Sequence, residues 1–114
     1  MKPGTTPVNT FTLPYELPSG TNYRVIYSQG EDYKEVILFE RTTESCIIDG
    51  KTLIVNLTDK ETLLFDDTPR HFQGKYEPYP IKIQIGIQTP SGHKDWSNII
   101  VTSVERVLRG DGLI

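Results

Sequence analysis

The sequence predicts an all-β protein, a single immunoglobulin-like antiparallel β-sandwich of about seven strands, with a small β-barrel as the alternative. Isoleucine occupies every second position from Ile81 to Ile87, with Lys, Gln or Gly between. Because successive side chains of a strand point to opposite faces, this stretch has one face for a core and one for water. Eight prolines and nine glycines divide the chain into short segments and disfavour long helices. Short alternating segments separated by turns are typical of such sandwiches.

Seven segments have the composition of strands, namely 8–13, 23–28, 35–40, 45–48, 52–57, 80–88 and 98–108. The first is followed by Pro14, and proline cannot donate to a ladder, so we expect an edge strand or a lead-in. The second and fifth place alternate apolar residues on one face. The third is apolar on both faces and is predicted to be central, whereas the fourth is short. The sixth is the isoleucine stretch, and the seventh is rich in Ile and Val.

Three connections carry specific signals. Asp49-Gly50, between the fourth and fifth segments, predicts a hairpin because its tight turn requires positive φ. Thr58 followed by Glu61 has the spacing of a capping box, which predicts one helical turn crossing from one sheet to the other. The loop 66–80 is long for so small a domain, as is typical of functional or disordered segments.

Length and composition limit the domain count and the classes of partner. The 114 residues fit one domain, 1–114, whose residues 1–8 form an N-terminal arm that we expect to become ordered along a neighbouring chain. The net charge of −3 and the scattered basic residues exclude nucleic acid as the expected partner. One cysteine permits no intrachain disulfide. No apolar run approaches the roughly 20 residues of a membrane span, and no signal-peptide pattern opens the chain, so we expect synthesis in the cytoplasm.

The sequence predicts no catalytic residue, no cofactor and no metal, and we expect the protein not to be an enzyme. Cys46 with His71 or His93 could form a nucleophile and its base, but a cysteine before an apolar pair is more typical of a buried structural thiol. Asp66 and Asp67 near His71 offer oxygen and nitrogen ligands, yet too few converge for a calcium or zinc site.

The predicted interaction site lies in the long loop and consists of Arg70, His71, Phe72, Tyr76 and Tyr79. Aromatic side chains in a polar segment are rigid anchors of the kind enriched at interfaces, and they suit a flat platform for a protein or a sugar ring. The compatible alternative is a lid that folds back over the edge of the sandwich. Trp96, just before the last segment, is predicted to plug the core at one end of the sandwich.

Several short motifs follow one another along most of the chain. They are GTTPVNTFTLP at 4–14, Cys-x-x-Asp-Gly at 46–50, LTDKETLLF at 57–65, an Ile-Gln-Ile strand, SNII at 97–100 and VLRGDGLI at 107–114. In this order the chain resembles a group of short structural-type proteins from phages and prophages of gut Gram-positive anaerobes. It departs from them in the longer aromatic segment 66–79 and in Arg109-Gly-Asp111, where a Lys-Asp-Gly type of ending is usual.

The resemblance implies a phage virion protein, made in the host cytoplasm and assembled into the particle. Together with the lack of a reactive cluster, it predicts a non-enzymatic immunoglobulin-like module that docks on head or tail by protein–protein contacts. The expected partners are other virion proteins and copies of the chain itself. The alternative is a carbohydrate-binding or adhesion module on the virion surface, which would bind a host-surface glycan through its aromatic side chains.

Overall fold

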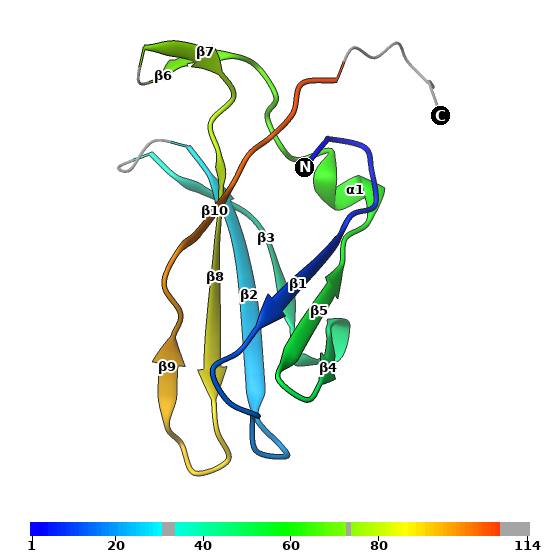
Figure 1. Ribbon diagram of the computed structural model, residues 1–114, viewed down its shortest axis with the longest axis vertical. Coiled ribbons are helices and arrows are strands. Elements are labelled where there is room, and N and C mark those ends of the chain that lie inside the picture. Colours follow the sequence, from blue (N-terminus) through cyan, green and yellow to red (C-terminus); the bar gives the residue numbers. More distant parts are fainter. Residues whose placement is uncertain (31–33, 73, 108–114) are drawn as a thin grey trace.

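The computed structural model describes residues 1–30, 34–72 and 74–107. Within these ranges the chain forms ten strands, one short helix and one 3₁₀ turn (Figure 1). The strands are β1 (Val8–Thr12), β2 (Asn22–Gln29), β3 (Val36–Thr42), β4 (Ile47–Asp49), β5 (Thr52–Asn56), β6 (Arg70–Phe72), β7 (Lys75–Glu77), β8 (Ile81–Gln88), β9 (Lys94–Trp96) and β10 (Ile100–Thr102). The 3₁₀ turn is η1 (Thr43–Ser45) and the helix is α1 (Asp59–Thr62).

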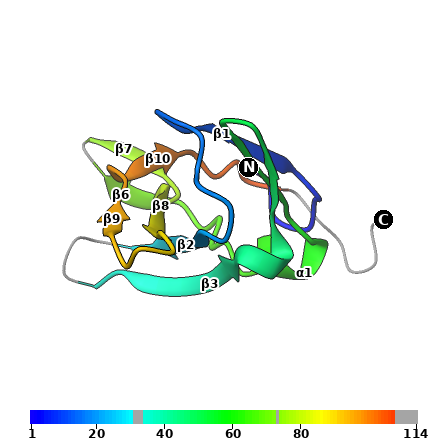
Figure 2. The same cartoon turned by 90° about the horizontal axis from the view of Figure 1, so that it is seen from below.

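The strands pair antiparallel in two larger sheets and one ribbon. The smaller of the two sheets has the order β1-β5-β4, and the larger has the order β10-β8-β2-β3. β9 also pairs with β8, opposite its last residues, while β10 lies opposite its first. β6 and β7 form the separate ribbon. Figure 2 shows β1 and β5 on one side of the molecule and β2 and β3 on the other. The expectation of a mostly β, antiparallel protein is confirmed, and the strands of the described ranges close no barrel.

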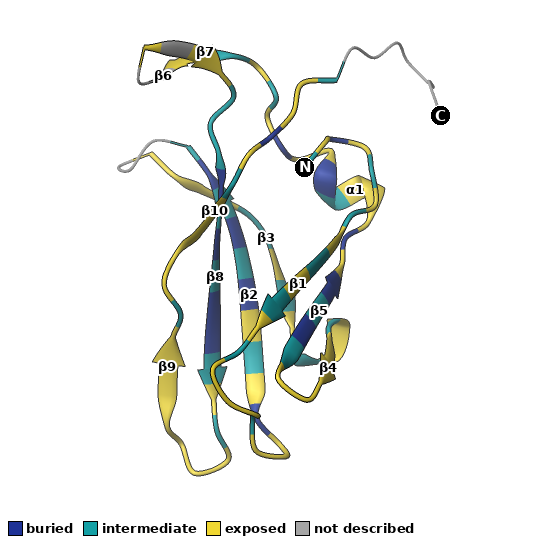
Figure 3. Cartoon of the chain, in the orientation of Figure 1, coloured by how far each residue is buried: buried dark blue, intermediate teal, exposed yellow. Residues whose placement is uncertain are grey.

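The core lies between these two sheets and is supplied by alternate residues of β2, β5 and β8 (Figure 3). Its buried side chains are Val25, Tyr27, Leu53, Val55, Leu57, Phe65, Ile81, Ile83, Ile85 and Val104. Tyr27 stands opposite Ile83, and Val25 opposite Ile85, so directly paired residues pack on the same inner face. Burial of one such side chain contributes about 1.5–3 kcal/mol. The alternation predicted for these three strands is therefore confirmed.

The prediction that the third strand is central is wrong. β3 pairs with β2 and forms the edge of the larger sheet, and Val36 and Ile37 are 60% and 57% exposed. A register shift opposite Tyr27 and Ser28 interrupts the pairing along β3. Beyond that shift Phe39 packs against the core, whereas the two residues at the start of the strand stay in solvent. The run of apolar residues in β3 therefore belongs to an edge strand that no other element fully covers.

The last predicted strand, 98–108, is divided and displaced. β9 precedes it, and β10 covers three residues of it. Between them Ser97 continues the ladder: its backbone N–H donates to the Ile85 carbonyl over 2.8 Å, and its Oγ accepts from the Ile85 N–H over 2.9 Å. Leu108 and the tripeptide Arg109-Gly-Asp111 lie outside the described residues.

The two local signals for a turn and a helix cap are confirmed. β4 and β5 form the hairpin with Asp49 opposite Thr52, so the loop is Gly50-Lys51, one residue later than Asp49-Gly50, and Gly50 has a φ of 59°. At α1 the Thr58 hydroxyl accepts from the Glu61 N–H over 3.2 Å, and a Glu61 carboxylate oxygen accepts from the Thr58 N–H over 2.9 Å.

The N-terminal arm, which we expected to become ordered along a neighbouring chain, makes hydrogen bonds to its own chain. The Met1 amino group donates to the Ser103 carbonyl over 2.6 Å, and the Glu105 N–H donates to the Met1 carbonyl over 3.0 Å. Further along, the Thr62 hydroxyl donates to the Thr5 carbonyl over 2.7 Å. The arm therefore bridges the segment after β10 and the helix α1.

A partly buried ion pair connects β3 to α1. Arg41 donates through Nε to one Glu61 oxygen over 2.6 Å and through Nη2 to the other over 2.5 Å. The same guanidinium donates to the carbonyls of Ser45 and Asn56, both over 2.8 Å. The two side chains are only 15% and 18% exposed. The hydrogen bond from Arg41 is the main reason that the pKa of Glu61 lies below its ordinary value.

We expect Glu61→Gln to lower the free energy of unfolding at about pH 7 by about 2–4 kcal/mol, because Arg41 then lacks its counter-charge. A carboxylate whose folded-state pKa is depressed contributes stability above its unfolded pKa of about 4.3, and this is lost as pH falls through the folded value. The difference between wild type and variant should therefore disappear in acid. Urea unfolding at several pH values measures it. Glu105→Gln, which breaks an exposed pair with Lys2, should have almost no effect, and a pH-independent difference would contradict the ion-pair account.

Tyr27 joins the two sheets through both its ring and its hydroxyl. The ring stacks on Phe39 with centroids 4.5 Å apart, and Phe39 in turn lies 5.9 Å from Phe65. The hydroxyl donates to Asn9 Oδ1 in β1 over 2.7 Å. Burial is the main reason that the pKa of Tyr27 is raised, so this hydroxyl stays protonated and keeps donating.

Tyr27→Phe should lower the free energy of unfolding by about 1–2 kcal/mol, because it leaves the Asn9 oxygen without its donor while keeping the stacked ring. Thermal and urea unfolding measure the loss. Tyr23→Phe is the matched control, since the Tyr23 hydroxyl makes a longer, 3.2 Å bond to the Thr43 carbonyl. An equal loss in the two variants would contradict the inter-sheet role of Tyr27.

Candidate functional site

The predicted long loop is a projecting hairpin held at its base by one buried glutamine. β6 and β7 stand off the end of the sheets, beyond β2 and β8 (Figure 1). Gln29, 6% exposed, donates through Nε2 to the carbonyls of Asp66 and Tyr79 over 2.7 and 2.8 Å. Its Oε1 accepts from the Asp66 N–H over 2.8 Å. One amide therefore binds the residues at which the chain leaves the sheets and returns to them.

The hairpin brings together two of the five predicted interaction residues. His71 pairs with Tyr76, and their rings lie 5.1 Å apart on the tip, where Tyr76 is 78% exposed. Arg70 points to the opposite face of β6, because neighbours alternate, and pairs with Asp66 over 2.9 Å. Tyr79 lies at the base, and Phe72 pairs with Lys75 through the backbone.

Among the four of these residues whose side chains the structure describes, Arg70 and His71 lie on opposite faces of β6 and Tyr79 lies at the base, so these four share no single flat surface. The hairpin also does not fold back as a lid, since it extends away from the sheets and its tip is exposed (Figure 1).

The candidate reactive groups are engaged in structural contacts. Burial is the main reason that the pKa of the Cys46 thiol is raised, which is opposite to what a thiolate nucleophile needs. Hydrogen bonds from Thr68 lower the pKa of Asp66, and an Asp67 oxygen accepts from the Val107 N–H over 3.1 Å. Among the described residues, no group of three His, Cys, Asp or Glu side chains converges where a metal ion could be held.

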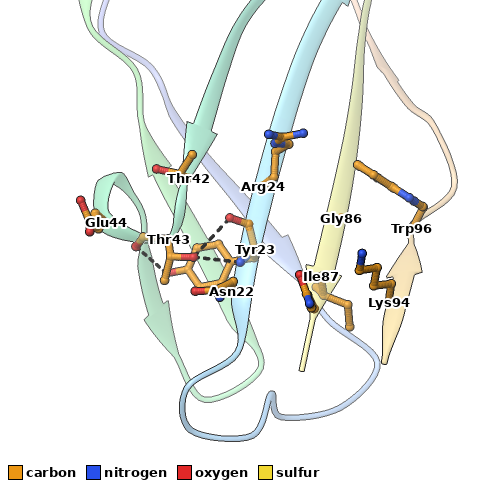
Figure 4. A pocket seen from close by; sticks show the side chains of 11 residues that line it. Asn22, Tyr23, Arg24, Thr42, Thr43, Glu44, Gly86, Ile87, Lys94 and Trp96 are labelled. Carbon is orange, nitrogen blue, oxygen red and sulfur yellow. Dashed lines mark hydrogen bonds between the residues drawn. The ribbon is translucent and has the colours of Figure 1, made fainter. Parts of the chain in front are cut away.

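The structure also has an open groove on the outer face of the larger sheet, of about 700 Å³, which sequence reasoning missed (Figure 4). One row of paired residues crosses its floor: Thr42 on β3 lies opposite Arg24, Arg24 opposite Gly86, and Gly86 opposite Trp96 on β9. At the far side Tyr23 holds η1 in place, because its N–H donates to Thr43 Oγ1 over 2.9 Å.

Trp96 is a surface residue, so the prediction that it plugs the core is wrong. It is 52% exposed and lies over Gly86, which it buries. A Cβ at position 86 would lie 2.5 Å from the indole Cζ3. Only glycine leaves room for the ring on this strand. Gly86, the glycine within the isoleucine stretch, was the one sequence signal for this contact. The contact was missed because β9 is too short and too polar to be predicted as a strand.

Apolar side chains also lie exposed along the edges of both sheets. On the β3–β4 side these are Val36, Ile37, Ile47 and Ile48, and on the β10 side they are Ile99, Ile100 and Val101. Soluble β-proteins commonly blunt their edges with charge or proline, because an open apolar edge is a template for another chain.

The chain matches no protein-family model, no curated protein and no solved structure. In the described part of the chain, no helix is long and apolar enough to cross a membrane.

Replacing Gln29 with Leu should release the base of the hairpin. The substitution keeps the volume but removes the partners of three backbone groups, so we expect a loss of about 2–4 kcal/mol in the free energy of unfolding. Amide hydrogen exchange should accelerate most across 66–79. Gln88→Leu, at an exposed position of β8, should leave these rates unchanged. Unaltered exchange in the Gln29 variant would contradict the clamp.

Proposed function

We propose that the chain is a non-enzymatic structural protein of a phage virion, a module that docks on head or tail by protein–protein contacts. The observation that carries this is the pair of open, apolar sheet edges on β3 and β4. Exposed strand edges bind other chains by adding a strand, with backbone hydrogen bonds for affinity and side chains for specificity. A virion offers many copies, and many weak contacts then add up. The phage assignment itself comes from the resemblance of the sequence motifs.

The order of the strands supports an immunoglobulin-like arrangement for this module. In such domains strands B, E and D form one sheet, and G, F, C and C′ form the other. The orders β1-β5-β4 and β10-β8-β2-β3 follow the same sequence of letters when β1 is taken as strand B. The position of a strand A beside β1 then lacks a strand among the described elements. This leaves a further edge for a neighbouring chain.

Residue chemistry favours β3 as the primary docking edge. Val36 and Ile37 are exposed next to each other, at the end of the strand nearest the projecting hairpin. Lys82 and Glu35 form an ion pair beside them, which leaves no uncompensated charge from these two side chains at that end. The proposed partners are other virion proteins and copies of the chain, and the proposed place of synthesis is the host cytoplasm.

Two measurements test this function. Mass spectrometry should find the chain in purified particles of the phage or induced prophage that encodes it. Ile37→Lys should weaken association of the purified chain with itself or with those particles by at least about tenfold, because a charged side chain then stands on the edge strand, next to the side chains of the added strand. Leu64→Lys, an equally exposed apolar position after α1, is the matched control. Absence from particles, or equal effects of the two variants, would contradict the proposal.

The second candidate, a carbohydrate-binding module on the virion surface, is favoured by a different observation. The groove beside Trp96 combines an exposed indole with polar side chains.

A further inference from the structure

We propose that the groove on the outer face of the larger sheet binds a neutral saccharide, with one sugar ring packed on the indole of Trp96. The inference does not depend on the virion proposal, because it rests on the chemistry of one face. The groove, of about 700 Å³, falls within the roughly 300–1,000 Å³ of ordinary small-ligand sites. Figure 4 shows Trp96 at one side of it and Thr42 and Thr43 at the other.

The indole is held in a fixed place beside the groove. Its six-membered ring lies over Gly86, and the pairing of β9 with β8 fixes its backbone. The bonds between Ser97 and Ile85 fix the next residue. About half of the Trp96 surface nevertheless remains in solvent. A rigid aromatic surface that needs no ordering on binding is well suited to the C–H face of a pyranose ring.

The other side chains of the groove can form hydrogen bonds with a ligand and create no strong electrostatic field. Asn22 lies opposite Gln88, one row from Trp96, and both amides are exposed. Within the described part of the chain, neither the side-chain amide of Asn22 nor that of Gln88 has a hydrogen-bond partner in the protein. An amide presents donors and an acceptor together, which matches the hydroxyl groups of a sugar.

The charges around the groove are balanced, which favours a neutral ligand. Arg24 forms an ion pair with Glu40 at 3.3 Å. Of the remaining lining residues, Lys94 and Glu44 carry opposite charges on opposite sides (Figure 4). Nucleic acid would need several uncompensated cations to neutralise phosphates, and these are absent from the described lining. An extended peptide would more readily join a free strand edge than lie across a sheet face.

Trp96 is the only tryptophan of the chain, so its fluorescence reports directly on this groove. The probes are neutral di- to tetrasaccharides of glucose, mannose, galactose and N-acetylglucosamine. At least one series should shift the Trp96 emission of the wild-type chain. Ligand-detected saturation-transfer NMR measures binding independently, including in variants without tryptophan.

Four variants distinguish the groove from other surfaces. Trp96→Ala should weaken binding by at least about tenfold, and Trp96→Phe, which keeps a ring, by less. The double change of Asn22→Ala with Gln88→Ala should weaken it several-fold while the emission spectrum of the free protein stays unchanged. Tyr76→Ala, on the hairpin tip, should leave binding unaltered. Circular dichroism and thermal unfolding confirm that each variant is folded.

The proposal is overturned if none of these sugars binds the folded wild-type chain in the millimolar range. It is also overturned if binding survives Trp96→Ala or is lost with Tyr76→Ala, which would place the site on the hairpin. Binding of a neutral peptide or an oligonucleotide to the groove, with no sugar bound, would assign a different ligand. None of these outcomes bears on the presence of the chain in virions, so the two proposals fail separately.

Discussion

The contact of Arg41 with Glu61 is the constraint on which the rest of the arrangement depends. At the end of β3 the chain leaves the larger sheet and turns through η1 into β4 of the smaller one. The guanidinium binds Glu61 and the carbonyls of Ser45 and Asn56, so it fixes the crossing, the helix and the end of β5 together. Because Glu61 also caps its own helix, one carboxylate serves two elements. A single charged pair at low exposure thereby connects the end of β3, the helix α1 and the end of β5.

Gln29 has the corresponding role at the other end of the larger sheet. Its amide binds both ends of the segment 66–79, so the hairpin is carried on the same rigid strand that supplies Val25 and Tyr27 to the core. The positions at which the chain leaves the sheets are thus fixed by hydrogen bonds of polar side chains, those of Arg41, Glu61 and Gln29, and not by apolar packing alone. This matters for a binding module, because loops that are positioned by a rigid frame lose less entropy when they meet a partner.

The sequence predicted those parts of the structure that depend on local patterns. Alternation identified the inner faces of β2, β5 and β8, and the spacing of Thr58 and Glu61 identified the cap of α1. The errors arose where neighbours decide the outcome. An apolar run such as 36–39 has the same pattern in a central strand and in an exposed edge strand, because periodicity does not show which other element covers a face of the strand. The groove depends on Gly86 lying opposite Trp96 in the hairpin of β8 and β9, and the short, polar β9 carries no alternation from which this pairing could be predicted. The projecting hairpin depends on Gln29, which reads as an ordinary strand end.

The two proposed surfaces are compatible on one small module because they lie at opposite ends of β3. Val36 pairs with Gln29 near the hairpin, whereas Thr42 pairs with Arg24 at the groove. A strand added along Val36 and Ile37 would occupy the first end and leave the indole of Trp96 on the outer face uncovered. Attachment through the opposite strand, β10, would instead add a chain on the side of the sheet that carries Trp96. Docking through β3 would therefore leave the proposed saccharide groove open, and for this reason we favour the β3 edge over the β10 edge in the proposed attachment.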